Sequence, residues 1–308
     1  MGRRRKGAAV DGIVLLDKPA GLSSNQALQR VRRLFDARKG GHTGTLDPFA
    51  TGLLPLCFGE ASKTTAFLLD ARKTYRAVAR FGAATSTGDP EGEVVAEGPV
   101  PNEDATAMDA LLNRFTGDIE QVPPMYSAIK IDGKPLYEFA RQGITVPRKP
   151  RRVTIHRMEL RDWSPPDLTF EVECSKGTYI RTLGEDLASS LGTVAHLVKL
   201  RRLGVGPFSG ERMVTLEALE LASEQGTLHD YLLPVDAGLP DWPVATLDAA
   251  GANAFQNGNP APLRSDSTAD FGTWVRAYGP GEVPLGLGQV EGGQVHPRKV
   301  FVRPAPDS

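Results

Sequence analysis

The chain has 308 residues, a formal net charge of −1, 40% hydrophobic residues and 24% charged residues. These values are typical of a folded globular protein with one large core and a smaller one, and they exclude a fibrous or fully disordered chain. No stretch approaches the roughly 18 consecutive apolar residues that a membrane-spanning helix needs. The basic start, residues 3–6, precedes no apolar signal core, so we expect a cytoplasmic protein that does not bind a membrane.

The two cysteines, Cys57 and Cys174, lie far apart in the sequence and form no Cys-x-x-Cys pair. A disulfide framework or a zinc site is therefore not expected. The sequence also contains no phosphate-binding glycine loop and no dinucleotide fingerprint. Any chemistry is expected to use the side chains of the protein itself, without a metal or a cofactor.

The charges are unevenly distributed although they nearly cancel. Residues 1–40 contain ten Lys or Arg against three Asp, and residues 130–161 contain nine Lys or Arg against three acidic residues. A basic segment on a neutral chain is typical of a surface that binds phosphates, although a single cluster is more often just a solvated surface. Two separate clusters favour an RNA partner.

The first elements follow from apolar patterning. Residues 12–16 predict a strand that ends in a turn at Asp-Lys-Pro. Ser23 or Ser24 is expected to cap a helix through about residue 36. Four apolar side chains share one face of that helix: Leu28, Val31, Leu34 and Phe35.

A single carboxylate, Asp47, follows in a turn rich in Gly, Thr and Pro, within the sequence G-H-T-G-T-L-D-P-F-A-T-G-L-L-P (41–55). Pro48 disfavours helical geometry at Asp47. Asp before Pro is also a common helix start, so the local sequence leaves open whether Asp47 caps a helix or carries chemistry. The apolar residues 51–59 predict a buried strand or a short helix.

Helix and strand patterns then mix without regular alternation. Residues 75–82 and 167–174 alternate as strands do, and residues 108–115 have the spacing of a helix. A leucine stripe predicts a further helix over about residues 183–191, so Arg181 lies where a strand gives way to a helix. This order favours an α+β fold over a doubly wound one.

The composition changes near residue 240. Beyond it, short apolar runs are broken by Gly, Pro and Asn, a pattern typical of a small barrel of short strands. We therefore expect a main domain at residues 1–240 and a small all-β domain at residues 241–308.

Six segments, in order along the chain, resemble sequence blocks of the TruB family of tRNA pseudouridine synthases. They are residues 12–25, 41–55, 73–76, 123–130, 174–183 and 200–203. Collinear blocks are far more specific than any one of them. The resemblance implies a pseudouridine-synthase-like, mixed and largely antiparallel sheet flanked by helices, and a PUA-like RNA-binding domain at the C-terminal end.

The resemblance also implies an isomerase that flips a uridine out of RNA, detaches the base at N1 and rejoins it through C5. It makes Asp47 the essential catalytic carboxylate. Five residues are implied to bind the nucleotide: His42, Tyr75, Tyr179, Arg181 and Leu200. Arg181 is expected to pair with Asp47 and lower its pKa, and Tyr75 to stack on the flipped base. Alone, each of these residues has an ordinary structural interpretation.

The resemblance implies that residues 123–152 form an insertion that grips RNA. Basic and aromatic side chains alternate here, which suits phosphate contacts and stacking on unpaired bases. The expected RNA-binding residues are Lys130, Lys134, Arg148, Lys149, Arg151 and Arg152. The implied partner is the T-arm stem-loop of tRNA, bound by a monomer without a guide RNA or a metal.

The leading hypothesis is therefore the conversion of uridine 55 in the T loop of tRNA to pseudouridine. The alternative is a tRNA-binding or folding chaperone without chemistry, and a third is a nucleoside hydrolase or transglycosylase that uses Asp47. Asp47, Tyr75 and Arg181 together favour the enzyme, because RNA binding alone needs no acid in a pocket for an anionic ligand. The basic segments argue against a small nucleoside substrate.

Overall fold

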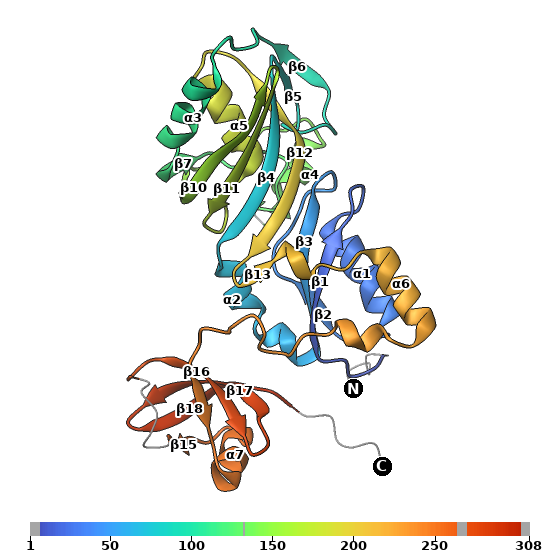
Figure 1. Ribbon diagram of the computed structural model, residues 1–308, viewed down its shortest axis with the longest axis vertical. Helices are drawn as coiled ribbons and strands as arrows, with labels where there is room; N and C mark the ends of the chain where they lie inside the picture. The colour runs from blue at the N-terminus through green and yellow to red at the C-terminus, as the bar shows by residue number, and fades with distance from the viewer. Residues whose placement is uncertain (1–6, 132, 264–269, 303–308) are drawn as a thin grey trace.

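The computed structural model describes residues 7–131, 133–263 and 270–302. A nine-stranded sheet dominates this part of the chain, and a separate five-stranded sheet lies below it in Figure 1. The large sheet contains, in spatial order, β1 (Gly12–Lys18), β3 (Thr51–Phe58), β12 (Ala195–Val205), β4 (Lys73–Phe81), β11 (Asp167–Cys174), β10 (Arg151–Ser164) and β7 (Gly117–Gln121), with β2 (Gly40–His42) on β3 and β13 (Phe208–Ser209) on β12.

The predicted α+β fold with a mixed, largely antiparallel sheet is confirmed. Only the pairing of β12 with β3 is parallel among the pairs described in this sheet. That pairing joins the N-terminal half of the sheet to the half that contains β4, β11 and β10. The segment 51–59, for which the sequence allowed a buried strand or a short helix, forms the strand β3. This strand is buried along nearly its whole length.

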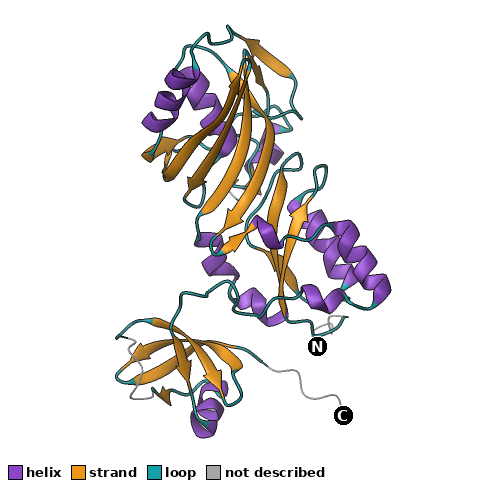
Figure 2. Cartoon of the chain, viewed as in Figure 1, coloured by secondary structure: helices purple, strands orange, loops and turns teal. Residues whose placement is uncertain are grey.

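The N-terminal half is covered by two helices, α1 (Ser24–Leu34) and α6 (Leu216–Gln225), which lie side by side (Figure 2). Ser23 caps α1, since its hydroxyl accepts a hydrogen bond from the Gln26 backbone N–H. In turn, the Gln26 side-chain oxygen accepts from the Ser23 backbone N–H. Leu28 and Val31 face the core, as the helical spacing predicted.

The other half carries α3 (Ala105–Arg114) and α5 (Ile180–Ser189) against one face of the sheet (Figure 1). The opposite face has charge pairs across its strands, for example Arg76 with Glu171 and Arg80 with Asp167. Strand β10 was not predicted. Its alternation of buried and exposed residues is interrupted by a register shift at residues 155–157, which hides the period of two.

Shorter elements connect these parts: η1 (Gly59–Lys63), α2 (Thr65–Asp70), β5 (Ala83–Thr85), β6 (Val94–Glu97), β8 (Lys130–Ile131), β9 (Lys134–Pro135), α4 (Leu136–Ala140), η2 (Gly210–Arg212) and η3 (Leu228–Tyr231). Strands β5 and β6 form one hairpin, and β8 and β9 form another. Both hairpins belong to the part of the molecule that surrounds Arg181.

The C-terminal sheet contains β14 (Val244–Thr246), β16 (Trp274–Gly279), β17 (Val283–Glu291), β18 (Gln294–Val300) and β15 (Ala261–Pro262). It has its own apolar core, and the short helix α7 (Ala249–Gln256), which the sequence pattern did not indicate, packs on it. Phe67 joins this unit to the rest, because its ring lies 4.7 Å from that of Trp242 and 5.3 Å from that of Trp274.

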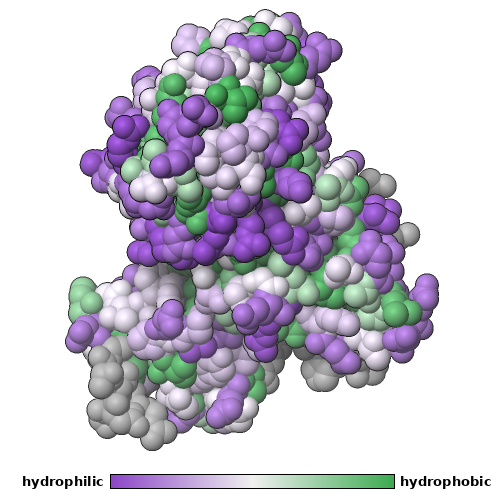
Figure 3. All heavy atoms as spheres, turned by 45° about the horizontal axis from the view of Figure 1, so that its top comes forward, coloured by the Kyte–Doolittle hydropathy of each residue, from purple (hydrophilic) through white to green (hydrophobic). Residues whose placement is uncertain are grey.

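Among the described residues, no helix is both long and apolar enough to cross a membrane. On the face shown in Figure 3, hydrophilic residues predominate and hydrophobic residues form separate small groups.

Candidate active site

The turn that carries Asp47 is held from both sides by neighbouring segments. Ser24 bonds twice to Leu46: its hydroxyl accepts from the Leu46 N–H at 2.7 Å and donates to the Leu46 carbonyl at 3.1 Å. The fully buried ammonium of Lys18 donates to the Pro48 carbonyl at 3.3 Å. Burial lowers the pKa of Lys18 to about 8.

These bonds fix the backbone on both sides of Asp47 in an irregular conformation. Residues 43–50 lie between β2 and β3 and belong to no helix. The interpretation of Asp47 as a helix cap is therefore wrong, and its carboxylate is free to face a side chain elsewhere in the fold.

That side chain is Arg181 at the start of α5. Its Nε lies 3.0 Å from Asp47 Oδ2, and its Nη1 lies 3.2 Å from Asp89 Oδ2. The guanidinium is 4% exposed, as is Asp89, whereas the Asp47 side chain is 34% exposed. Asp47 is thus the member of the triad that a ligand can reach, and the predicted Asp47–Arg181 pair is present.

Arg181 also links the carboxylates to two loops. Its Nη1 donates to the Thr87 carbonyl at 2.6 Å, and its Nη2 donates to the Tyr126 carbonyl at 2.7 Å. Thr87 lies between β5 and β6, and Tyr126 lies in the segment 123–152 that was predicted to grip RNA. One buried side chain therefore sets the positions of the acid and of both loops.

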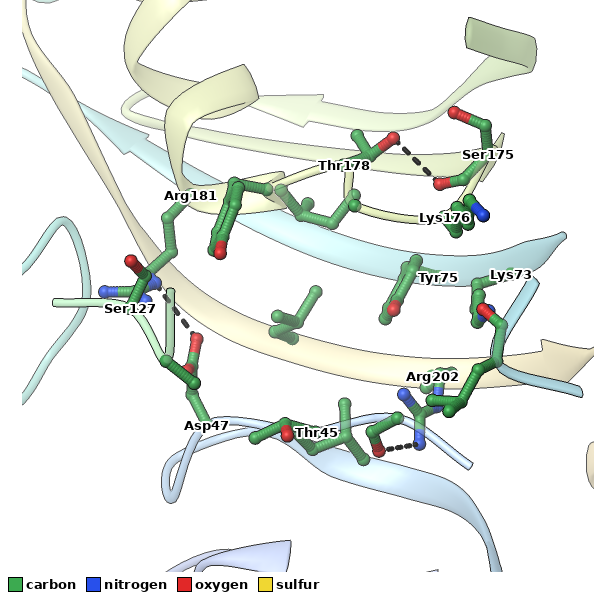
Figure 4. Close-up of a pocket in the computed structure, with 18 of the residues that line it drawn as sticks. Thr45, Asp47, Lys73, Tyr75, Ser127, Ser175, Lys176, Thr178, Arg181 and Arg202 are labelled. Atoms are coloured by element: carbon green, nitrogen blue, oxygen red, sulfur yellow. Dashed lines mark hydrogen bonds and ion pairs between the residues drawn. The ribbon is translucent and has the colours of Figure 1, made fainter. Parts of the chain in front are cut away.

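Asp47 lies on the wall of a cavity of about 370 Å³ (Figure 4). Five of the six predicted site residues line it: Asp47, Tyr75, Tyr179, Arg181 and Leu200. His42 does not. It lines a second cavity of about 450 Å³, and the two cavities share Asp47 and Arg181 as part of their walls. The structure thus places the carboxylate where two chambers meet.

Tyr75 and Leu200 come from neighbouring strands of the sheet. In the pairing of β4 with β12, Leu200 lies opposite Ala77 and Tyr75 lies opposite Arg202, so their side chains share one face. Tyr75 is 9% exposed and Leu200 is 7% exposed. This wall is flat, mostly apolar and suited to the face of a flipped base.

The sequence analysis missed several charged residues of the site, among them Lys73 and Lys176 on the cavity wall, and two others need comment. Asp89 gives no local signal, because it lies in a Gly- and Pro-rich turn that resembles any surface turn. Arg202 follows Leu200 in L-R-R-L, a segment that was noted, but only Leu200 was expected in the pocket. The period of two along β12 places Leu200 and Arg202 on the same face, and this signal was available.

Comparison with known proteins shows to which family this chain belongs. Three family models match: the TruB family pseudouridylate synthase N-terminal domain at residues 32–180, the tRNA pseudouridylate synthase B C-terminal domain at residues 181–240, and the pseudouridine synthase II TruB C-terminal domain at residues 243–301. The tRNA pseudouridine synthase B of Burkholderia mallei is 52% identical over 297 residues, which are 96% of this chain and 98% of the relative. The chain belongs to the TruB family.

Other TruB relatives and solved structures agree with this assignment. The tRNA pseudouridine synthase B of Pseudomonas aeruginosa is 49% identical and covers 95% of this chain and 96% of its own. A chain in the crystal structure of a Cbf5-Nop10-Gar1 complex matches with a TM-score of 0.71 and 25% identity, over 94% of this chain and 85% of that one. The fold, including the PUA-like C-terminal unit, is therefore that of the pseudouridine synthases.

The pKa of Asp47 differs from the sequence-based expectation. Burial raises it above its usual value of 3.8, and the negative charge of Asp89 adds to the rise; the charge of Arg181 opposes both but does not reverse them. Arg181 does lower the pKa, as expected, but the net shift is upward because burial outweighs it. Arg181 is shared between two carboxylates, so each gains less from it than a single partner would.

This shift gives a pH dependence. If the ionised form of Asp47 is the active one, the single-turnover rate of this TruB-family chain rises with pH and levels off only above a pKa higher than 3.8. Asp89→Asn removes a negative charge, so its acid limb should move to lower pH. Rates measured from about pH 5 to pH 8 on folded protein test this. Asp167 lies on the outer face of the sheet, so Asp167→Asn should leave the pH of the acid limb unchanged.

The predicted RNA-binding residues lie together around β8, β9 and the start of β10. Most are exposed: Lys130, Lys134, Lys149, Arg151 and Arg152. Arg152 also pairs with Asp118 at 3.0 Å. Arg148 differs, because it is half-buried and its Nη1 donates to the Pro123 carbonyl at 2.9 Å. Part of its function is therefore to hold this segment.

Proposed function

We propose that this protein converts uridine 55 in the T loop of tRNA to pseudouridine, with Asp47 as the essential carboxylate. The observation that carries the proposal is a partly exposed Asp47, ion-paired to the buried Arg181, on the wall of a cavity that has the size of a small-ligand site. The family of the chain supports the reaction, and the relatives named tRNA pseudouridine synthase B support tRNA as the substrate.

The two cavities suit a nucleotide that has been swung out of its stack. The flipped uridine occupies the cavity of Tyr75 and Leu200, where the Tyr75 ring replaces stacking lost in the RNA, an exchange worth about 1–3 kcal/mol per base. The adjacent cavity holds the nucleotides that remain in the loop, next to His42, Tyr137 and Arg141. Asp47, at the junction, reaches the ribose that connects the two.

The proposal is tested with an unmodified tRNA transcript. The protein should produce one pseudouridine per tRNA, detected by nucleoside analysis and located at position 55 by carbodiimide mapping. A transcript with cytidine at position 55 is the matched control and should yield none. Binding of both transcripts without any pseudouridine would instead support the chaperone without chemistry.

We further propose that residues 123–152 grip the T arm through phosphate contacts. Lys149 and Arg151 are exposed, and among the described residues neither has a carboxylate within ion-pair distance. Changing both to Ala should weaken tRNA binding and reduce the slope of log Kd against log salt by about 0.7–0.9 per lost contact. Fluorescence anisotropy over a salt series measures this.

The control for the salt experiment is the double change of Arg157 and Arg161 to Ala. Both arginines lie on β10, but both pair with Glu159. Their removal should leave the salt slope unchanged. If the Lys149 and Arg151 variant also kept the slope of the unchanged protein, this part of the segment would not contact phosphates.

The remaining parts of the proposal concern assembly. The division into a catalytic domain at residues 1–240 and a PUA-like RNA-binding domain at 241–308 is supported by the separate core of the second sheet. We propose that the chain acts as a monomer and without a guide RNA. The hydrophobic groups on the face shown in Figure 3 are scattered, which supports the monomer for that face, because a stable interface needs a larger apolar patch. Sedimentation of the protein with and without tRNA tests both.

A further inference from the structure

Arg202 is a fully buried arginine on the wall of the cavity that contains Asp47. It is 1% exposed, and it lies opposite Tyr75 in the pairing of β12 with β4. Its Nε donates to the Leu53 carbonyl at 2.7 Å and its Nη2 to the Gly44 carbonyl at 3.3 Å. Both acceptors are neutral.

A buried guanidinium is usually paired with a carboxylate, because an uncompensated charge in the interior costs several kcal/mol. Within the described ranges 7–131, 133–263 and 270–302, no carboxylate lies within ion-pair distance of Arg202. The two backbone bonds use two of its five N–H groups. The charge and the remaining donors therefore face Tyr75 and the cavity.

The neighbouring cations at this end of the cavity are already engaged. The Lys73 ammonium donates to the carbonyls of Leu68, Leu69 and Ala71 at 2.5 to 3.2 Å, and Lys176 pairs with Asp70 at 2.7 Å. Burial, and after it the charge of Arg202, lower the pKa of Lys73 to about 8. Lys73 has its three donors occupied and Lys176 is 61% exposed, so Arg202 is the buried cation among these three with donors left for a ligand.

Arg202 and Asp47 lie at opposite ends of the cavity, with Tyr75 beside Arg202 (Figure 4). A uridine has its ribose at one end and the O4 carbonyl of its base at the other, while O2 lies beside the ribose. If Asp47 faces the ribose, as proposed above, the base stacks along Tyr75 and Leu200 and turns its O4 edge towards Arg202.

On the basis of the proposed function, we propose that Arg202 stabilises the negative charge that develops on the uracil ring when its bond to the ribose breaks. The N1–C1′ bond breaks with its electron pair going to the ring, where it is shared among N1, O2 and O4. C1′ is compensated either by a bond to an Asp47 oxygen or by loss of the C2′ proton to Asp47. Either route leaves the same uracil anion.

The charge on the ring is temporary. The bond from C5 to C1′ forms with a ring electron pair while the bond from C1′ to Asp47 breaks or, on the other route, while C2′ takes its proton back from Asp47. The C5 proton then leaves and N1 takes up a proton, so that the product is an isomer of the substrate and no oxidant or reductant is needed. A fixed guanidinium that faces the oxygens of the anion more closely than those of neutral uridine lowers the barrier to the first step.

A merely structural role for Arg202 makes a different prediction. Through Gly44 and Leu53 the guanidinium also holds both ends of the turn that carries Asp47. A variant that only loosened this turn would slow every substrate equally. A variant that failed to stabilise the anion would slow a poor leaving group more than a good one. The fluorine of 5-fluorouracil stabilises the ring anion, so 5-fluorouridine is the better leaving group.

The experiment compares Arg202→Gln with the unchanged protein on two tRNAs that carry uridine or 5-fluorouridine at position 55. First-turnover loss of the original nucleoside is measured after nuclease digestion. We expect Arg202→Gln to slow uridine about 100-fold and 5-fluorouridine several-fold less. Arg202→Lys, which keeps a cation, should show the same order with smaller losses. Arg201→Gln, at a partly exposed pair with Asp17, is the control and should change neither rate.

Equal losses on the two substrates in both folded variants, or no loss, would overturn the proposal. These outcomes are separate from the fate of the proposed function, which depends on pseudouridine formation by the unchanged protein. Circular dichroism melting curves identify the folded temperature range for each variant, and the rates are compared within it.

Discussion

Asp47→Asn is expected to reduce pseudouridine formation by about 10⁴-fold or more, the effect typical of removing a group that acts directly on the reacting bond. The amide keeps the shape of the side chain, and Ser24 and Lys18 hold the turn through the backbone of Leu46 and Pro48, so the turn should stay in place. Binding of tRNA should therefore change only several-fold. Single-turnover rates with tritium release from C5-labelled uridine, together with tRNA titrations, measure the two effects.

The matched control is Asp167→Asn. Asp167 also pairs with an arginine, Arg80, but on the outer face of the sheet, where both side chains are partly exposed. That variant should keep its full rate and lose no more than about 1 kcal/mol of unfolding free energy. Comparable turnover by the Asp47 and Asp167 variants would remove Asp47 from the chemistry.

The fold was predictable from the sequence wherever patterns were local and uninterrupted. Polar and apolar residues alternate over all eight residues of β11, and α1 combines a capping box with an apolar stripe, so both were found. Strand β10 was missed because its bulge disrupts the alternation. Helix α7 was missed because its eight residues, AAGANAFQ, contain one large apolar side chain, Phe255, and therefore show no apolar stripe.

The residues of the site were predictable only where a segment resembles a family motif. The resemblance indicated Asp47, Tyr75 and Arg181, which line one cavity although they come from a turn, a strand and a helix that lie far apart in the sequence. It did not indicate Asp89, whose importance arises from a contact with Arg181 across 92 residues. No sequence period connects a loop residue with a helix residue so far along the chain.

The pKa of Asp47 shows a further limit of pairwise reasoning. One arginine beside one aspartate predicts a lowered pKa, but the structure adds a second carboxylate and removes most of the surrounding water. Both changes raise the pKa of Asp47. The electrostatics of a site depend on every charge around it, and the sequence indicates only those within a motif.

Arg181→Met is expected to be the change most damaging to stability, and it should reduce activity as well. It removes the only charge that compensates Asp47 and the buried Asp89 at ion-pair distance among the described residues, and it breaks the bonds to the Thr87 and Tyr126 carbonyls. Breaking a buried pair typically costs about 3–5 kcal/mol of unfolding free energy. The rate should fall by about 10²–10³-fold or more. Chemical denaturation and single-turnover kinetics measure the two losses, with Arg80→Met as the exposed control.

The pH dependence of that loss identifies its cause. Without Arg181 the pKa of Asp47 in the folded state rises further above its value in the unfolded chain, because an opposing positive charge has gone. A carboxyl with a raised folded pKa destabilises the fold as pH increases through that pKa, so the deficit of Arg181→Met should be larger at about pH 7 than at about pH 5. A deficit equal at the two pH values would attribute the cost to the lost carbonyl contacts of Thr87 and Tyr126, and the carboxylates would then be solvated well enough to need no partner.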